Sequence, residues 1–326
     1  MSGSLAGALV PVVAAALGGI DIEIVGLRRL SGGASRETWS FDAVEPGGTT
    51  HALILRRDPP GAARGGMGME AEVVRAAEVA GVPVPRLLAA DDDPEILGAG
   101  FMLMDRLEGE TIPRKILRDT DYDGVRPTLA RRCGEIVAAL QRVPVASVPS
   151  LVAEDQVARF RAVLDMVGQP HPAFELGFRW LEENRPAPTE PVVVHGDFRN
   201  GNLMVGADGI RAVLDWELAH LGDPMEDLGW LCVKSWRFGQ AAPVGGFGDY
   251  DELCDAYEAA SGRPVDRRSL HWHETLGTLK WGIMCIMQAV THTSGIVRSV
   301  ELAAIGRRVC EVEHDLLRCL DAAPAG

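Results

Sequence analysis

Hydrophobic positions are spaced differently in the two parts of this chain. Over residues 20–100 they fall in short runs bounded by glycine and polar residues, which is the pattern of strands. Residues 69–80 have helical spacing instead, and Gly81, Pro83 and Pro85 mark the end of that helix. The first hundred residues therefore predict a small α+β lobe. Its predicted strands are residues 27–30, 37–41, 52–56 and 101–104.

From about residue 125 onward the spacing of apolar residues becomes helical over long stretches. One segment interrupts it, because two short apolar runs, residues 203–205 and 210–214, flank a Gly-Ala-Asp-Gly turn and predict a hairpin. We therefore expect a larger, mostly helical second lobe that contains this hairpin. The predicted helices are residues 128–141, 157–166, 174–184, 270–290 and 300–320.

The chain of 326 residues is long enough for two lobes in close contact. We place the small lobe at residues 1–104, a hinge at residues 105–109 and the helical lobe at residues 110–326. The apolar run at residues 5–17 follows no basic residue, contains Pro11 and is too short to cross a bilayer. It is therefore expected to form a helix that covers the small lobe, and no membrane partner is expected.

The net charge of −14 argues against nucleic acid as a partner, since Lys and Arg do not gather into a stripe that could follow a phosphate backbone. Residues 191–230 hold seven acidic and two basic residues, whereas residues 231–326 hold twelve and ten. The near balance of the later region weakens the case for a polycationic substrate. The six cysteines form no Cys-x-x-Cys pair, so we expect buried packing thiols and a cytoplasmic protein.

Three polar residues on and beside the predicted hairpin carry the chemistry of this chain. Asp197 and Asn202 lie five positions apart in one tight loop, and Asp215 ends the second apolar run. Because a hairpin returns the chain to its starting point, we expect the three side chains to converge. One carboxylate can take the proton of an acceptor hydroxyl, while the amide oxygen and the second carboxylate are suitable ligands for Mg²⁺ on ATP phosphates. The pattern predicts a phosphotransfer site.

Arg199 lies two positions after the first aspartate of this loop. A cation at that place can neutralise charge on the transferring phosphoryl group, and the alternative is a salt bridge to Asp223 or Asp227. We expect those two aspartates to cap the next helix and to brace the loop. His195 is expected to be buried, with its ring bonded to backbone near Asp215, and not to act as the base.

A second group of residues lies in the predicted small lobe. Gly32, Gly33 and Ser35 fall between two strands, where backbone amides can approach a phosphate, although such a loop is more often only a turn. Arg56 ends a strand and Glu70 begins the helix that follows. Glycine loop, cation and carboxylate thus occur in the order in which protein kinases hold the α and β phosphates of their nucleotide.

The cation in this series is an Arg where a Lys is usual, and its larger fork leaves the role of Arg56 open. Arg57 is a competitor for the same role. Because side chains alternate along a strand, Arg56 and Arg57 point to opposite faces, and only one of them can face a nucleotide.

Two sets of residues on the predicted helix 270–290 and just after it have more than one interpretation. His271 and His273 resemble a metal pair, but no third ligand follows at a suitable spacing, so a helix N-terminus is favoured. The second set could line an acceptor pocket or pack in the core with equal probability. Its members are Trp272, Trp281, Met284, Met287 and His292.

Five short segments carry a resemblance to a known family. They are residues 194–202 (Val-His-Gly-Asp-Phe-Arg-Asn-Gly-Asn), 212–217 (Ala-Val-Leu-Asp-Trp-Glu), 222–224 (Gly-Asp-Pro), 55–61 (Leu-Arg-Arg-Asp-Pro-Pro-Gly) and 81–85 (Gly-Val-Pro-Val-Pro). These segments resemble the aminoglycoside phosphotransferase-like (choline kinase-like) family. The branch that is most similar consists of kinase-like domains fused to acyl-CoA dehydrogenases. The resemblance extends over about residues 25–230 and is most specific over residues 194–228.

The resemblance implies a two-lobed protein-kinase-like fold of the α+β class. It implies that adenine binds at the hinge, through backbone near Asp105 and Leu107. It also implies that Asp197 is the base and that Asn202 and Asp215 bind magnesium.

The acceptor is expected to be a small molecule with a hydroxyl group, because only eleven residues separate Asp215 from Asp227, too few for the activation segment of a protein kinase. The dehydrogenase-linked branch implies hydroxyacyl compounds or their CoA thioesters. The broader family implies aminoglycosides or amino alcohols. A non-catalytic nucleotide-binding regulatory module is the alternative, suggested only by Arg56, and a homodimer is left open.

Overall fold

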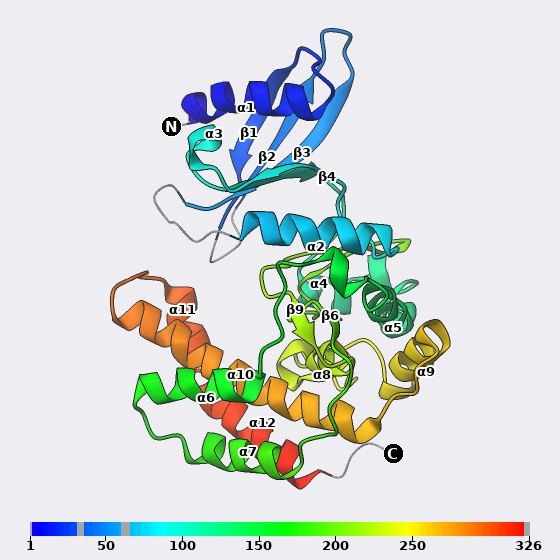
Figure 1. Cartoon of the computed structure of the whole chain (residues 1–326), viewed down its shortest axis with the longest axis vertical. Helices are drawn as coiled ribbons and strands as arrows, with labels where there is room; N and C mark the ends of the chain where they lie inside the picture. Colours follow the sequence, from blue (N-terminus) through cyan, green and yellow to red (C-terminus); the bar gives the residue numbers. More distant parts are fainter. Residues whose placement is uncertain (1, 31–35, 60–65, 323–326) are drawn as a thin grey trace.

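The computed structural model describes residues 2–30, 36–59 and 66–322, which form two lobes. Figure 1 shows a sheet-containing lobe at the top and a larger helical lobe below it. The predicted α+β, two-lobed architecture is confirmed. Gly32, Gly33 and Ser35 lie outside the described residues.

The small lobe contains a five-stranded antiparallel sheet in the order β1-β2-β3-β5-β4. All four predicted strands are present, with shifted bounds, but β4 was not predicted. Its Leu-Leu-Ala-Ala sequence has no β-branched or aromatic residue that would indicate a strand. The strands are β1 (Glu23–Arg29), β2 (Glu37–Val44), β3 (Thr50–Arg57), β4 (Leu87–Asp91) and β5 (Phe101–Asp105).

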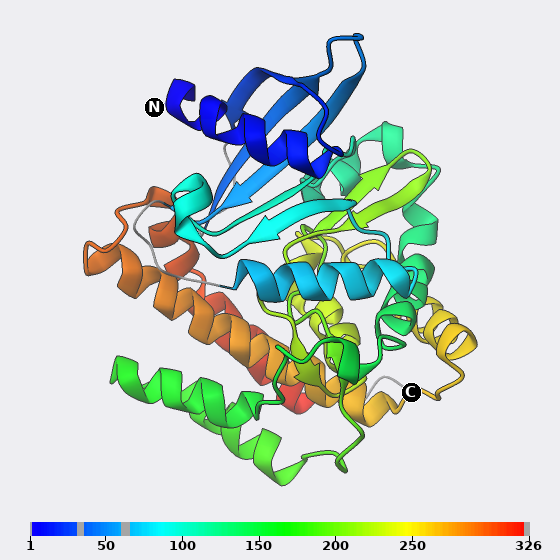
Figure 2. The same cartoon turned by 45° about the horizontal axis from the view of Figure 1, so that its top comes forward.

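Helices cover both faces of this sheet. Phe101 and Leu103 of β5 pack on one face with α1, which confirms the predicted N-terminal helix. Met102 and Met104 point to the other face and join the core that contains α2, as the alternation of a strand requires. Helix α2 therefore lies between the sheet and the large lobe, as both views show (Figure 1, Figure 2). The helices of the small lobe are α1 (Ser2–Ala16), α2 (Met67–Val79) and α3 (Pro94–Leu97).

The large lobe is mostly helical and contains two short two-stranded sheets, β6 with β9 and β7 with β8. The pair β7 and β8 is the predicted hairpin. The strands are β6 (Val192–Val194), β7 (Leu203–Gly206), β8 (Gly209–Val213) and β9 (His220–Gly222). The helices are α4 (Pro113–Arg118), α5 (Leu129–Leu140), α6 (Gln156–Val167), α7 (Pro172–Glu183), α8 (Glu226–Cys232), α9 (Tyr250–Ser261), α10 (Arg267–Thr293), α11 (Val300–Gly306) and α12 (Val309–Asp321), with short 3₁₀ turns that include η4 (Lys234–Arg237).

The prediction of one helix over residues 300–320 was wrong, because α11 and α12 are separate helices. The break follows Gly306, which packs so closely on α10 that a β-carbon there would lie 2.5 Å from Ala289 Cβ. Glycine is also a poor helix former. Helix α9 was not predicted, although Asp249 and Glu252 form the reciprocal capping box that marks a helix start.

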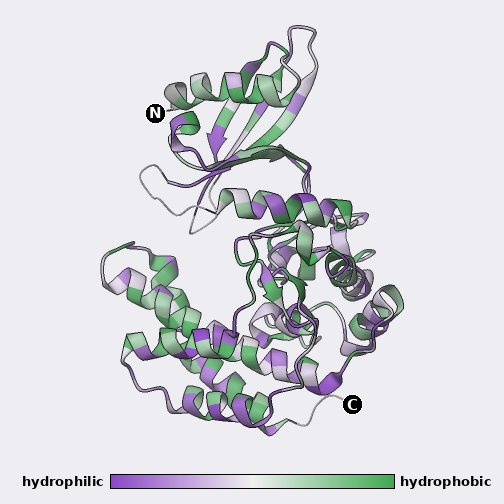
Figure 3. Ribbon diagram, in the orientation of Figure 1, coloured by the Kyte–Doolittle hydropathy of each residue, from purple (hydrophilic) through white to green (hydrophobic). Residues whose placement is uncertain are grey.

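Hydrophilic and hydrophobic residues alternate around α6, α7 and α10 in Figure 3, as expected of amphipathic helices packed on a core. Among the described residues no helix combines the length and the apolar character needed to cross a membrane. The six cysteines form no disulfide. The prediction that all of them are buried was wrong for Cys310, which is exposed, and for the half-buried Cys319.

Candidate active site

The loop between β6 and β7 brings three of the predicted site residues together. Asp197 Oδ1 accepts hydrogen bonds from Arg199 Nε (2.9 Å) and from Trp230 Nε1 (2.9 Å). Asn202 Nδ2 donates to Asp197 Oδ2 (2.6 Å) and to its backbone carbonyl (2.9 Å). The Asp197 carboxylate is therefore held by donors on both oxygens.

Asp227 anchors the backbone of the same loop. Its carboxylate accepts from the backbone N–H groups of His195 (2.7 Å) and Gly196 (3.0 Å). Gly196 has φ +78°, and a β-carbon there would lie 2.3 Å from the Leu218 carbonyl oxygen, so only glycine fits. The prediction that Asp227 braces the loop is confirmed.

His195 is fully buried, and its Nε2 lies 3.0 Å from the carbonyl oxygen of Leu214, the residue before Asp215. Burial lowers the pKa of His195, and this effect is larger than that of the carboxylates around it, which raise the pKa. A neutral ring bonded to backbone orients the two segments that it joins. This is the orienting role that the sequence predicted.

Asp215 follows β8 and has a left-handed backbone, with φ 69°. The Leu214 N–H donates to the Asn202 carbonyl (2.8 Å), so Asn202 and Asp215 lie at the same end of the hairpin. A non-glycine residue in the left-handed region is strained, and such strain persists where surrounding structure fixes it, often at functional sites.

The Arg56 side chain crosses from the small lobe to the large one. Its Nη2 lies 2.7 Å from Asp215 Oδ1, and its Nη1 lies 3.4 Å from Glu70 Oε2. Glu70 is fully buried on α2 and also pairs with Arg36. The structure thus places Arg56 and Glu70 in contact with each other and with Asp215.

Arg57 points away from this group, as strand alternation requires. It pairs with Glu37 (2.9 Å) and donates to the Leu97 carbonyl (3.0 Å). The question of which arginine faces the junction between the lobes is therefore answered in favour of Arg56.

The predicted hinge, residues 105–109, begins at the last residue of β5. The Asp105 carboxylate pairs with Arg86 (2.9 Å), and its N–H donates to the Arg86 carbonyl (3.0 Å). Arg106 N–H donates to the Ala52 carbonyl on β3, and Leu107 is half-buried. Asp105 is thus the last residue of a strand, and Leu107 lies in the segment that leaves the sheet.

The alternative salt bridges for Arg199 are absent, since Asp227 bonds to the loop backbone and Asp223 pairs with His273 (3.3 Å). Arg199 pairs with Asp197 instead. Asp223 also accepts from Met225 N–H (2.8 Å), the residue before α8. The prediction that both aspartates cap this helix was wrong for Asp227, which is the second residue of α8.

Three tryptophans, of which Trp230 contacts Asp197, form a group that sequence analysis missed in part. We call Trp230, Trp236 and Trp281 the tryptophan cluster. The rings of Trp230 and Trp236 are 5.2 Å apart, and those of Trp236 and Trp281 are 4.8 Å apart. The Arg199 guanidinium lies 4.7 Å from the Trp236 ring centre. Spacing could not reveal the cluster, because its members come from α8, η4 and α10.

The five residues considered for an acceptor pocket separate into three groups. Trp272 is a core residue whose indole N–H donates to the Leu181 carbonyl (2.9 Å). Trp281 and Met284 pack against Trp236 in a different, smaller core. Met287 and His292 are half-buried further along α10 and on its last turn.

The two histidines of the His-x-His pair also make different contacts. His271 Nε2 lies 3.0 Å from the Cys319 carbonyl oxygen, whereas His273 faces Asp223. Both lie within the first two turns of α10, close to the predicted helix start. Within the described residues no group of three or more His, Cys, Asp or Glu side chains could hold a metal ion.

A buried ionic network supports the loop from α8, β9 and α10. His220 Nε2 lies 3.2 Å from Glu226 Oε2, and Lys280 donates to the Gly196 carbonyl (2.9 Å). Burial opposes ionisation of Glu226, but the hydrogen bond and charge of His220 outweigh it and lower its pKa to about 2. Burial also opposes the charge of His220, whose pKa is nevertheless raised by Glu226.

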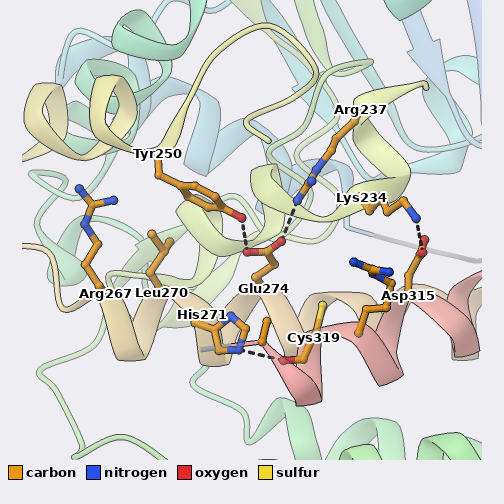
Figure 4. A pocket seen from close by; sticks show the side chains of 11 residues that line it. Lys234, Arg237, Tyr250, Arg267, Leu270, His271, Glu274, Asp315 and Cys319 are labelled. Carbon is orange, nitrogen blue, oxygen red and sulfur yellow. Dashed lines mark hydrogen bonds and ion pairs between the residues drawn. The ribbon is translucent and has the colours of Figure 1, made fainter. Parts of the chain in front are cut away.

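A cavity of about 280 Å³ is lined in part by Lys234 and Arg237 of η4. Neither Asp197 nor Asp215 is among its lining residues. Figure 4 shows Glu274 between Tyr250 and Arg237, which hold its two oxygens at 2.8 Å and 2.9 Å. Burial raises the pKa of Glu274 to about 7 despite these partners. The cavity is therefore separate from the candidate active site.

A small β-lobe, a helical lobe and, at their junction, a carboxylate, an amide and a second carboxylate form the arrangement expected of a kinase-like phosphotransferase. The sequence model of the phosphotransferase enzyme family matches residues 26–279, and the chain belongs to this family. It is therefore a small-molecule kinase.

Curated relatives of this chain are named as acyl-CoA dehydrogenase family members. The mouse acyl-CoA dehydrogenase family member 10 is 28% identical over 220 residues, which are 61% of this chain and 20% of that protein. The human acyl-CoA dehydrogenase family member 11 is 29% identical over 195 residues, or 54% of this chain and 24% of that protein. The chain thus spans about a fifth to a quarter of the length of these relatives.

Solved structures show the same fold. A Ralstonia eutropha protein assigned as an aminoglycoside phosphotransferase has a TM-score of 0.75 at 22% identity, covering 97% of this chain and 98% of its own. Spectinomycin phosphotransferase, solved with ADP and spectinomycin, has a TM-score of 0.65 at 12% identity, covering 96% and 98%. At these identities the likeness concerns the fold alone.

Proposed function

We propose that this protein transfers the γ-phosphoryl group of ATP to a hydroxyl of a small molecule, with Asp197 as the base. The observation that carries the proposal is the convergence of Asp197, Asn202 and Asp215 at the junction of the lobes, with Arg56 reaching Asp215 from the small lobe. Kinase chemistry needs these groups in one place, because it depends on positioning and on charge neutralisation.

In the proposed step the acceptor oxygen attacks the γ-phosphorus as its proton passes to Asp197. The bond between the γ-phosphorus and the bridging oxygen breaks, and ADP leaves with that electron pair. Asp197 then releases the proton to solvent. Arg199 lies on the same loop and can turn from Asp197 to the transferring group, whose charge a guanidinium neutralises well.

Magnesium fits the residues that face the nucleotide side. Asn202 donates from Nδ2 to Asp197, so its amide oxygen is available as a ligand. Asp215 contacts Arg56 through Oδ1, so its Oδ2 is available as a second ligand. Oxygen donors of this kind suit Mg²⁺. When bound, the ion would neutralise charge on the phosphates.

The nucleotide is proposed to lie between the lobes. Arg56, oriented by Glu70, is the candidate phosphate cation, and the amides of residues 32–35, with Gly32, Gly33 and Ser35, are proposed to cover the phosphates. The backbone near Asp105 and Leu107 is proposed to bind the adenine. The lobe boundaries at residues 104/105 and 109/110 belong to the same proposal.

For the acceptor, a hydroxyacyl compound or its CoA thioester is favoured over an aminoglycoside or amino alcohol. The Asp197 carboxylate contacts Trp230 and Arg199 on the large-lobe side, and Trp236 packs against both of them. Aromatic rings suit an acceptor with an apolar part, and the near balance of charge over residues 231–326 weakens the case for a polycation. The names of the curated relatives point in the same direction.

The test is transfer of radiolabelled γ-phosphoryl from Mg-ATP to a panel of hydroxyacyl-CoAs, hydroxy acids, aminoglycosides and amino alcohols. Asp197→Asn is the inactive control, and GTP replaces ATP in a parallel series. We expect labelled product only with hydroxyacyl compounds and only with Asp197 intact.

Two outcomes would change the proposal. Labelling of aminoglycosides or amino alcohols alone would keep the kinase and replace its acceptor class. Binding of Mg-ATP without transfer to any member, and equal in wild type and Asp197→Asn, would favour the regulatory module that binds nucleotide without catalysis.

A further inference from the structure

Trp230 contacts the proposed base from a helix that follows it by about thirty residues. Its indole N–H donates to Asp197 Oδ1 at 2.9 Å, on the same oxygen that Arg199 Nε occupies. A carboxylate oxygen has two lone-pair sites, so these two donors fill Oδ1. Among the described residues Oδ2 has one donor, Asn202, so one of its sites can take an acceptor hydroxyl.

The indole of Trp230 is held rigidly. All seven residues of α8 are buried, and Trp230 itself is 2% exposed. Its ring packs on Trp236, and the Lys280 ammonium lies 4.6 Å from the ring centre. Helix α10 approaches so closely that a β-carbon at Gly277 would lie 2.9 Å from the indole. The direction of the N–H bond is therefore fixed by packing.

The two donors on Oδ1 differ in charge and in freedom. Arg199 is half-buried on the loop and is needed on the phosphoryl group during transfer. Trp230 is neutral and cannot move without repacking α8 and α10. When Arg199 turns to the phosphoryl group, Trp230 is the donor that remains on Oδ1.

We propose that Trp230 is a positioning residue for the phosphotransfer reaction: its indole N–H holds the Asp197 carboxylate so that Oδ2 accepts the proton of the acceptor hydroxyl. This inference rests on the proposed function of Asp197. In the step described above, the proton goes to Oδ2, while Oδ1 stays bonded to Trp230 throughout.

The chain provides a matched control in Trp272. It is 5% exposed, and its indole N–H also makes one 2.9 Å hydrogen bond, to the Leu181 carbonyl in a separate core. Trp230→Phe and Trp272→Phe thus remove the same group from equally buried positions. Only the first removes it from Asp197.

The first measurement needs no acceptor. In ¹H–¹⁵N spectra of the full chain, the two Phe variants assign the indole signals of Trp230 and Trp272 among the seven tryptophans. We expect Asp197→Asn to shift the Trp230 signal and to leave the Trp272 signal in place. A Trp230 signal that does not respond to Asp197→Asn would overturn the proposal.

The second measurement is steady-state transfer to the acceptor identified above. Trp230→Phe removes a hydrogen bond to a charged group, and this loss should lower kcat by about 10-fold to 100-fold. The KM for Mg-ATP should be unchanged, and Trp272→Phe should keep the kcat of the wild type. A purely structural role of a buried indole would lower kcat equally in both variants.

Equal kcat in Trp230→Phe and Trp272→Phe would overturn the proposal. If wild type transfers phosphate to no acceptor, the proposed function fails. The spectral test still decides separately whether Trp230 holds Asp197, so the two failures are distinguishable.

Discussion

Asp197 and Asp215 lie at the same junction but are held in different ways. In the part of the chain that the structure describes, the side chains that bond to the Asp197 carboxylate all belong to the large lobe, namely Arg199, Asn202 and Trp230. The partner of the Asp215 carboxylate is Arg56, which comes from β3 of the small lobe and is anchored on α2 by Glu70.

This difference separates two requirements of the site. The base is organised inside one lobe, so a change in the angle between the lobes leaves its geometry intact. Asp215 is tied across the junction, so its charge environment depends on the position of the small lobe. Asp215 has a positive φ, a strained conformation that the surrounding structure must maintain. Such strain is expected where the position of a side chain is more important than local stability.

The largest effects are expected from Asp197→Asn and Asp215→Asn. Each should lower kcat by about 10²-fold to 10⁴-fold, because each removes a charged group that acts on the reacting atoms. The two should differ in metal dependence. Asp215→Asn should raise the Mg²⁺ concentration needed for half-maximal Mg-ATP binding in calorimetry, while Asp197→Asn should not. Equal metal dependence in both variants would contradict the separation of the two carboxylates.

The next effect is expected from Arg56→Gln. It removes the contact between the lobes and the candidate phosphate cation, and the KM for ATP should rise by about 10-fold or more, as loss of a charge-assisted contact predicts. Arg57→Gln, one residue along the same strand, is the control, since its partners are Glu37 and Leu97. If both variants raise the KM equally, the effect comes from the strand and not from the phosphate contact.

The same contrast explains what the sequence could and could not predict. Local spacing is enough for the loop of Asp197 and Asn202, for the hairpin that returns Asp215, and for the opposite faces of Arg56 and Arg57. Strands and helices with clear periodicity were found within a few residues of their bounds. These features depend on neighbours in the chain.

Features made by distant segments were missed. Trp230 reaches Asp197 from 33 residues away, and Arg56 reaches Asp215 from 159 residues away. Neither distance follows from periodicity, because packing of α8 against α10 and docking of the lobes decide them. The same reason explains the error at residues 300–320, where contact of Gly306 with α10 ends a helix that the apolar pattern would continue.

A smaller effect on catalysis is expected from Arg199→Lys. The lysine keeps the charge but loses the planar stack on Trp236 and the Nε donor to Asp197. We expect kcat to fall by about 10-fold with little change in the KM for ATP, because Asn202 and Trp230 still hold the base. Steady-state kinetics with Arg199→Ala for comparison checks this, and a lysine variant as slow as the alanine variant would show that geometry, and not charge, is the contribution of Arg199.

The smallest catalytic effect is expected from His220→Asn, which tests whether the large lobe supports Asp197 through stability alone. The raised pKa of His220 means that its stabilising charge is fully present below its ordinary pKa of about 6.5 and is lost as pH rises through the folded value. The lowered pKa of Glu226, about 2, gives the opposite sign: its contribution is present above about 4.5 and is lost only as pH falls toward 2. The pair therefore contributes most between these limits.

Breaking this buried pair should lower the free energy of unfolding by about 3 kcal/mol near pH 5.5 and by less at pH 9, measured by urea unfolding. The small-lobe pair His51–Glu45, at 2.7 Å and more exposed, is the matched control, and His51→Asn should cost less than about 1 kcal/mol. At 25 °C, His220→Asn should keep kcat within about twofold, because Asp227, Asn202 and Trp230 still fix the loop and its carboxylate. A large fall in kcat with native stability would mean that the charge of His220 acts on Asp197 directly, and that the base depends on more of the large lobe than its hydrogen-bond partners.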